Sequence, residues 1–285
     1  MHGSIVDNGY AECSDLVRRT DKDRFLATLF APADRRDHLY ALYAFNSEVA
    51  QVRDKVSDAL PGEVRLQWWN DVLAGGGHGE VQRHPVAAAL LDTLRTFSLP
   101  AEPLIEIVEA RTFDLYDEPL ATLTDLEGYV ASTASVPMRV SAAILGAGDA
   151  ETVRAMAREG GLAYGMVGLL RSIWHHAARR KVYVPEEVLA RHGVAPHDIL
   201  IGRRTANLDA ALAELRQRAR KHLDAADRLR AEVPVAAMPA FLPLALARAY
   251  LDRMEKRGYD PFRDCTIPQW RRQWILWRAA RRELA

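Results

Sequence analysis

Residues 39–54 read LYALYAFNSEVAQVRD, and the spacing within this stretch decides the fold class. Tyr40, Tyr43 and Ala44 stand at positions i, i+3 and i+4, so they share one face of a helix. Four further side chains continue this face, namely Ser47, Ala50, Gln51 and Asp54. The stretch from Leu39 to Asp58 is therefore predicted to be a helix with aromatic and polar side chains on a common face.

A second stretch of this kind runs from Leu162 to Pro185 and reads LAYGMVGLLRSIWHHAARRKVYVP. Ser172 and His176 are four residues apart, so they project together from a helix. The neighbouring His175 diverges from His176 by about 100°, and HExxH spacing is absent, which argues against one shared metal ion. The faces of the two stretches are predicted to oppose each other across a cavity.

Helical periodicity extends along the whole chain. Apolar residues recur at helical spacing, as at Leu104, Ile107 and Val108, whereas alternating runs typical of strands are scarce. Glycine and proline clusters mark the joints between helices, and no break is long enough to be a domain linker. We expect an all-α fold with one domain over residues 11–285 and an N-terminal tail over residues 1–10.

Composition excludes several classes of partner and location. Lys plus Arg and Asp plus Glu each number 38, so net charge gives no reason to expect nucleic acid as a partner. Cys13 and Cys265 lie far apart without CxxC spacing, which argues against a zinc site or a disulfide framework. No signal peptide is evident, and the apolar runs at 39–52 and 162–174 fall short of the roughly 20 residues of a membrane span. A cytoplasmic location is expected.

The two central stretches resemble the squalene and phytoene synthase family. The resemblance rests on DRFLATLFAPADRRDHLYALYAFNSEVAQVRD at 23–54 and LLRSIWHHAARRKVYVPEEVLARHGV at 169–194. It covers the chain from about residue 11 onward and implies an isoprenoid-synthase fold, a helical bundle around a large central pocket. In active members, two aspartate-rich motifs on facing helices hold magnesium ions that neutralise a departing diphosphate, which needs clustered oxygen ligands.

This sequence departs from both motifs. Matched without gaps, the three aspartates of the first motif fall on Ala50, Gln51 and Asp54, so only the last position is acidic. The pair of aspartates in the second motif falls on Ser172 and His176. One isolated carboxylate cannot hold several hard divalent ions. No metal site and no cofactor are therefore expected, and magnesium would be required only if the chain were an active prenyl transferase.

Two upstream positions also depart from the pattern. The serine that helps to hold diphosphate in the family corresponds to Asp23, and the basic residue before the first motif corresponds to Ser47. A carboxylate at the first position would repel a phosphate, and a neutral hydroxyl at the second would not attract it. The resemblance therefore implies a lapsed diphosphate site.

A closer resemblance exists to one branch of the family, the mitochondrial complex I assembly factors, which lack the aspartate motifs. The shared residues are Ala44, Phe45, Asn46, Glu48, the AQV run at 50–52, Asp54, Val56, Ser57, Leu170, Arg171, His176, the RRKV run at 179–182, Pro185 and the HGV run at 192–194. This resemblance implies a non-catalytic protein whose partners are subunits or assembly intermediates of respiratory complex I, the membrane NADH dehydrogenase.

Candidate pocket-lining residues follow from the motif positions, and no residue is assigned a catalytic role. They are Asp23, Tyr43, Asn46, Ser47, Ala50, Gln51, Asp54, Arg171, Ser172, His176, Lys181 and Tyr183. His176 is expected to be a hydrogen-bonded polar residue of the pocket, because buried polar groups need partners. Asp54 is expected to pair with Arg171 or with the basic run at 179–181, because an unpaired buried carboxylate is costly.

Two other functions stay open from the sequence. A divergent prenyl transferase that condenses isoprenyl diphosphates is compatible with the fold signature and the predicted pocket. A binding module that keeps an isoprenoid or another lipid in the old cavity, without chemistry, is the third hypothesis.

The C-terminal stretch from Gln269 to Arg282 has a composition of its own. Trp270, Trp274 and Trp277 recur at i, i+4 and i+7 among five arginines. This spacing is typical of a helix that docks on a core, and core docking is the favoured interpretation. Aromatic and basic residues together also suit peripheral contact with an anionic membrane, here the inner membrane, which is the alternative.

Overall fold

The computed structural model describes residues 2–76, 81–148 and 150–284. Helices account for all regular secondary structure in these ranges, which confirms the all-α prediction. The main helices are α1 His2–Thr20, α2 Lys22–Thr28, α3 Ala33–Ala50, α4 Ala59–Leu73, α5 Pro85–Thr96, α6 Glu102–Thr112, α7 Leu123–Val130, α8 Val136–Ile144, α9 Glu151–Arg171, α10 Ile173–Ala178, α11 Glu186–Arg191, α12 Pro196–Leu200, α13 Ala206–Leu229, α14 Met238–Phe241, α15 Pro243–Met254 and α16 Gln269–Glu283.

Short helical turns join several of these helices. A π-helical turn, η4, spans Ala131–Ser135 between α7 and α8. The 3-10 turns are η1 Arg53–Lys55, η2 Val81–Arg83, η3 Phe113–Leu115, η5 Arg230–Glu232 and η6 Val235–Ala237.

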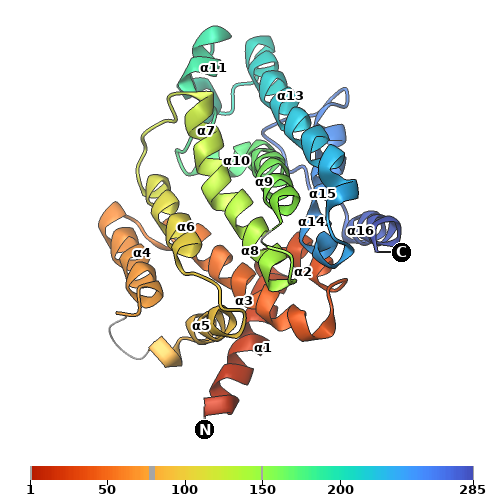
Figure 1. Cartoon of the computed structure of the whole chain (residues 1–285). Helices are drawn as coiled ribbons and strands as arrows, with labels where there is room; N and C mark the ends of the chain where they lie inside the picture. The colour runs from red at the N-terminus through yellow and green to blue at the C-terminus, as the bar shows by residue number, and fades with distance from the viewer. Residues whose placement is uncertain (1, 77–80, 149, 285) are drawn as a thin grey trace.

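Helix α9 is the centre of the bundle. It packs along α13 on one side and along the α7–η4–α8 segment on the other, and α15 also contacts it (Figure 1). Gly161 and Gly165 of α9 face that segment, where a Cβ on Gly161 would lie 2.2 Å from Cα of Ser135. These glycines let two helix backbones approach more closely than any side chain would allow.

The N-terminal helices form a second layer. Helix α1 packs against α3 and α5 (Figure 1), and Tyr10 near its middle is buried, with its hydroxyl donating to Asp92 over 2.7 Å. Helix α1 is continuous across the predicted boundary between residues 10 and 11. Residues 2–10 therefore belong to the first helix of the bundle and do not form a separate tail.

Both predicted motif helices are shorter than the sequence suggested. Helix α3 ends at Ala50, Gln51 occupies its C-terminal cap, and Asp54 lies in η1. Helix α9 ends at Arg171, and Ser172 separates it from α10. The N–H of Ser172 bonds to the carbonyl of Leu169, a tightened last turn. The prediction of one continuous helix through Ser172 and His176 was therefore wrong.

Helix α16 docks through a face other than the tryptophan stripe. Its buried residues are Arg272, Leu276, Ala279 and Ala280, whereas Trp270, Trp274 and Trp277 are exposed to 70%, 54% and 41%. The prediction that the tryptophans dock on the core was wrong. Arg272, Leu276 and Ala279, each two positions after one of the tryptophans, contact the core instead.

One stretch of the described chain, Val235–Met254, is long and apolar enough to cross a membrane by length and composition. In the fold it is divided between η6, α14 and α15, and 67% of its most apolar window is buried. It therefore packs as part of the protein core, with α15 against α9.

Candidate functional site

A polar pocket lies where the end of α3 faces α10 and the chain that follows it. Its volume is about 100 Å³. The lining residues are Ala50, Arg53, Asp54, Arg111, Asp114, Asp117, Tyr129, Leu169, His175, His176, Arg179, Lys181 and Tyr183. The structure thus brings together five of the residues chosen from the sequence, which are Ala50, Asp54, His176, Lys181 and Tyr183.

The other sequence candidates lie elsewhere. Asp23 and Arg171 form a separate ionic cluster, described below. The buried Tyr43 hydroxyl accepts a hydrogen bond from Ser141 over 2.8 Å. Two further candidates, Asn46 and Ser47, are also buried, and the Asn46 side-chain oxygen has no hydrogen-bond partner within the described ranges. Gln51 and Ser172, at helix ends, line neither this pocket nor the apolar one beside it.

Asp114 organises the inner wall of the polar pocket. One carboxylate oxygen accepts hydrogen bonds from Tyr129 over 2.8 Å and from Tyr183 over 2.7 Å. The other oxygen accepts from Arg111 over 3.1 Å, and Arg111 also donates to the Tyr129 hydroxyl. Burial raises the pKa of both tyrosines, so both stay neutral hydrogen-bond donors. Both carboxylate oxygens of Asp114 therefore already accept hydrogen bonds from within the protein.

Asp54, the acidic residue among the three positions matched to the first motif from the sequence, is bound to a cation. Arg179 pairs with its carboxylate, and Nε2 of His175 lies 3.9 Å away. Arg179 belongs to the basic run expected from the sequence, whereas the alternative partner, Arg171, pairs with Asp23 instead. The Asp54 carboxylate is therefore committed to a protein cation.

Lys181 is held by backbone carbonyls. Helix α10 ends in a Schellman motif, with Arg180 in the left-handed region at φ 58° and the Lys181 N–H bonded to the His176 carbonyl. This turn directs the Lys181 ammonium to the carbonyls of Phe113, Tyr116 and Glu118. The three carbonyls match the three N–H donors of the ammonium. Lys181 therefore holds η3 and the residues after it in place through hydrogen bonds.

A second cluster surrounds Asp23 at the start of α2. Its carboxylate, 2% exposed, accepts from Arg272 of α16 over 2.9 Å and from Arg171 at the end of α9 over 3.4 Å. The Arg171 guanidinium also lies over the Tyr250 ring, 4.6 Å from its centroid. Two convergent guanidinium groups suit a phosphate or a carboxylate. Here the carboxylate of Asp23 fills that place.

The ligands present do not fit a magnesium cluster. Within residues 2–76, 81–148 and 150–284, no three His, Cys, Asp or Glu side chains are grouped so that they could hold a metal ion. Of the three aspartates that line the pocket, Asp54 and Asp114 are each bound to an arginine, and only Asp117 has no ion pair with a described residue. A cluster of magnesium ions needs several free carboxylate oxygens at near-octahedral geometry, and one remaining carboxylate does not supply them.

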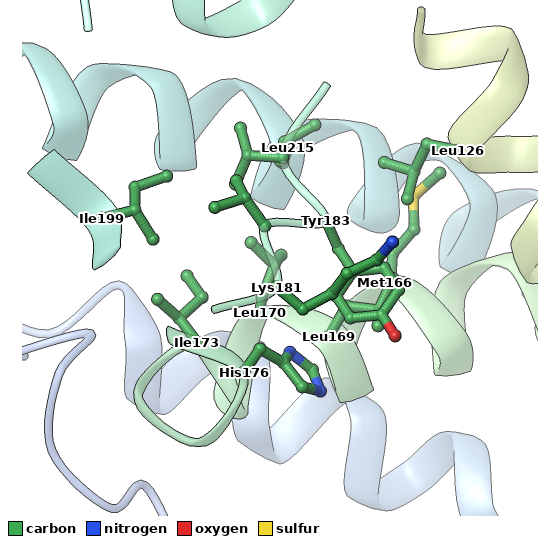
Figure 2. A pocket seen from close by; sticks show the side chains of 12 residues that line it. Leu126, Met166, Leu169, Leu170, Ile173, His176, Lys181, Tyr183, Ile199 and Leu215 are labelled. Carbon is green, nitrogen blue, oxygen red and sulfur yellow. The ribbon is translucent and has the colours of Figure 1, made fainter. Parts of the chain in front are cut away.

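An apolar pocket, shown in Figure 2, shares Leu169, His176, Lys181 and Tyr183 with the polar one. Leu170 and Ile173 line it beside His176, Lys181 and Tyr183. Its volume of about 20 Å³ has room for about one water molecule. At this position, side chains of α9, α10 and the segment that follows α10 occupy most of the space.

His176 lies between both pockets. Its ring packs edge-on against Tyr183, with centroids 4.7 Å apart, and makes no hydrogen bond with a described residue. The expected hydrogen bond is thus replaced by an aromatic contact. Burial, followed by the charge of His175, lowers the pKa of His176 to about 4.

The low pKa of His176 predicts acid sensitivity. In the unfolded chain His176 binds a proton near pH 6.5, whereas in the folded chain it does so only near pH 4. The stability that the neutral His176 contributes is therefore fully present above about pH 6.5 and is lost as the pH falls toward 4. Because the ring is only partly buried, we expect a loss of about 2 kcal/mol. Urea unfolding at pH 7 and 4.5 should show a smaller pH effect in His176→Gln than in the wild type or in the control His197→Gln, which alters an exposed histidine. Equal pH effects in all three proteins would contradict the prediction.

Several residues of the polar pocket and of the Asp23 cluster were not among the candidates chosen from the sequence. They are Arg53, Arg111, Asp114, Asp117, Tyr129, His175 and Arg179 at the pocket, and Tyr250 and Arg272 beside Asp23. The motif positions gave no signal for most of them, although Arg179 belongs to the basic run that was expected to pair with Asp54. For Arg272, the available indication was a charge on an otherwise apolar helix face.

Comparison with known proteins identifies the family. The family model for squalene/phytoene synthase matches residues 17–278. Complex I assembly factor 6 of Homo sapiens is 32% identical over 250 residues, which cover 88% of this chain and 75% of the relative. The 15-cis-phytoene synthase of Synechococcus elongatus is 26% identical, with 94% of this chain and 91% of the relative covered.

Solved structures agree with this relationship. The squalene synthase HpnC of Alicyclobacillus acidocaldarius superimposes with a TM-score of 0.76 at 26% identity, over 90% of this chain and 97% of HpnC. A dehydrosqualene synthase superimposes with a TM-score of 0.83 at 17% identity, over 100% of this chain and 99% of that one, which supports the fold alone. The resemblance expected from the two central stretches is thereby confirmed, and the chain belongs to the squalene/phytoene synthase family.

Proposed function

We propose that this protein is a non-catalytic member of its family that acts as an assembly or binding factor for respiratory complex I. The observation that carries the proposal is the internal pairing of the charges at the two former motif faces. Asp23 is held by Arg171 and Arg272, and Asp54 is held by Arg179. The similarity to assembly factor 6 supplies the identity of the proposed partner.

The charge pairing argues against diphosphate chemistry. A departing diphosphate needs several divalent ions, which in turn need free clustered carboxylates. Four of the five positions matched to the family's motif aspartates are Ala50, Gln51, Ser172 and His176, which supply no carboxylate. The small volume beside His176 also leaves no space there for an isoprenoid chain. These features support a role through the surface of the protein, and the similarity to assembly factor 6 makes subunits or assembly intermediates of complex I the proposed partners.

A product assay tests the loss of catalysis. Purified protein is incubated with magnesium or manganese and with labelled farnesyl or geranylgeranyl diphosphate, and both hydrocarbon and released diphosphate are measured. We expect neither product, beside an active family enzyme as the positive control. Turnover would show an active prenyl transferase and would overturn the non-catalytic part of the proposal.

Gene deletion tests the assembly role. In a host with respiratory complex I, removal of this protein is expected to lower the amount of assembled NADH:quinone oxidoreductase in membranes, as seen by native gels and NADH oxidation. Succinate oxidation in the same membranes is the control for general respiratory damage. Restoration by the wild-type gene is expected, and normal complex I in the deletion strain would refute the role.

A further inference from the structure

The outer face of α16 combines exposed indole rings. Trp270, Trp274 and Trp277 follow one another at i, i+4 and i+7 and are the most exposed tryptophans of the described chain apart from Trp174. Trp274 and Trp277 stack with ring centroids 5.1 Å apart. Such a continuous apolar stripe on the surface costs free energy in water, so it marks a face that meets another phase or partner.

Exposed arginines flank this stripe. Arg271, Arg278 and Arg281 make no ion pair with any residue in the described ranges, although the Arg281 guanidinium lies over the Trp277 ring at 5.1 Å. The only acidic residue of the helix, Glu283, is bound by Arg230 and Arg282. Since the whole chain has no net charge, the positive charge of this face is a local feature that favours an anionic partner.

A groove runs beside the stripe, between α16 and the helices α13 and α15. Its volume is about 840 Å³. Apolar residues such as Leu244 and Ala249 line it together with Arg271 and Arg278. An apolar surface bordered by guanidinium groups matches the boundary between lipid headgroups and acyl chains, where tryptophan and arginine are both favoured.

The position of α16 allows this face to meet a plane. The helix lies at the edge of the bundle, next to the C-terminus (Figure 1). Its inner face is fixed by the buried Arg272 and Leu276, so the outer face is presented by a rigid element. A helix of 15 residues is about 22 Å long and can lie flat in the interface.

We propose that the outer face of α16 is a docking surface for an anionic phospholipid bilayer. The tryptophan rings enter the interfacial region, and Arg271, Arg278 and Arg281 bind the phosphate groups of the headgroups. The protein binds as a peripheral protein, with no segment crossing the bilayer. This inference rests on α16 and the groove beside it, and does not depend on the proposed role in complex I assembly.

Co-sedimentation of the full chain with vesicles tests the proposal. Vesicles of phosphatidylglycerol and phosphatidylcholine are compared with vesicles of phosphatidylcholine alone, at low and high salt. We expect binding to the anionic vesicles that weakens with salt, and a blue shift of tryptophan fluorescence on binding. Replacing Trp270, Trp274 and Trp277 by alanine is expected to weaken partitioning by at least about a hundredfold.

Charge variants separate the two parts of the surface. Arg271→Gln, Arg278→Gln and Arg281→Gln are each expected to weaken binding about fivefold, by the usual value of one basic residue near an anionic surface. The matched control carries Leu60→Ala and Val64→Ala, which remove comparably exposed apolar side chains on α4, across the bundle (Figure 1). Circular dichroism and thermal unfolding should be unchanged in all variants, because each altered side chain is exposed.

Three outcomes would overturn the proposal. The full chain would fail to bind anionic vesicles at low salt, the tryptophan variant would bind as tightly as the wild type, or binding would be the same on neutral vesicles. Sedimentation of the protein without vesicles distinguishes a second copy of the chain as the occupant. A dimer that the tryptophan substitutions dissociate, together with no vesicle binding, would assign the face to self-association.

Discussion

Replacing Asp23 by alanine is expected to lower the free energy of unfolding by about 3–5 kcal/mol. The substitution removes the counter-charge of Arg272, whose side chain is only 10% exposed, and of Arg171, which is one-third exposed. A buried cation without a partner keeps the cost of its desolvation with no ion pair to offset it. The better-buried Arg272 therefore accounts for most of the lost stability. Urea unfolding at pH 7 measures the effect.

A matched control for Asp23 exists on the surface. Asp15 pairs with Arg18, and both side chains are 64% exposed. Asp15→Ala should change stability by less than about 0.5 kcal/mol, because solvent screens such pairs. If Asp23→Ala were as mild as Asp15→Ala, the carboxylate of Asp23 would not be the anchor of this cluster.

An added anion should substitute for the lost carboxylate. In Asp23→Ser, the two guanidinium groups face an open space that a phosphate could fill, so inorganic pyrophosphate is expected to raise the melting temperature by mass action. The wild type should show no such rise, since Asp23 occupies the place. The double variant Asp23→Ser, Arg272→Met should also lose the response, and a response of equal size in this double variant would contradict the geometry.

Asp114→Ala is expected to destabilise the fold by about 3 kcal/mol. The carboxylate is the common acceptor of Tyr129, Tyr183 and Arg111, and all four groups lie in the interior wall of the pocket. Its loss leaves two phenol donors and one guanidinium without their acceptor. Asp114→Asn keeps one oxygen that can accept from both tyrosines and loses the acceptor of Arg111, so a smaller loss of about 1–2 kcal/mol is expected.

Chemical denaturation measures both Asp114 variants. The control is Asp117→Ala, which alters another aspartate of the same pocket that has no ion pair with a described residue. Equal stability of Asp114→Ala and Asp117→Ala would show that the hydrogen-bond network around Asp114 contributes no more than an exposed carboxylate.

The helical bundle and its family were predictable because they depend on periodicity and local motifs. Tyr40, Tyr43 and Ala44 report a helix within one turn of sequence. The end of that helix at Ala50 was less predictable, because Gln51 and Val52 continue the apolar and polar pattern while the backbone has already turned. Helix ends depend on tertiary packing as much as on local residues.

The candidate site was predicted only in part, because its contacts join distant segments. Asp114 meets Tyr183 across 69 residues, and Arg272 meets Asp23 across 249. No periodicity within a window of the sequence reports such pairs. In α16 the spacing of the tryptophans predicts a helix, but it does not tell which face of that helix is buried.

The ion pairs of Asp23 also bear on the history of this chain. A step back toward chemistry through Asp23→Ser leaves Arg171 and Arg272 without an internal anion and lowers stability before any ligand is gained. New aspartates at Ala50 or Ser172 bring no advantage while the Asp23 carboxylate occupies both Arg171 and Arg272. Under the proposed non-catalytic role, a chain that carries Asp23 would reach a diphosphate site only through less stable intermediates, so selection on folding alone disfavours that route.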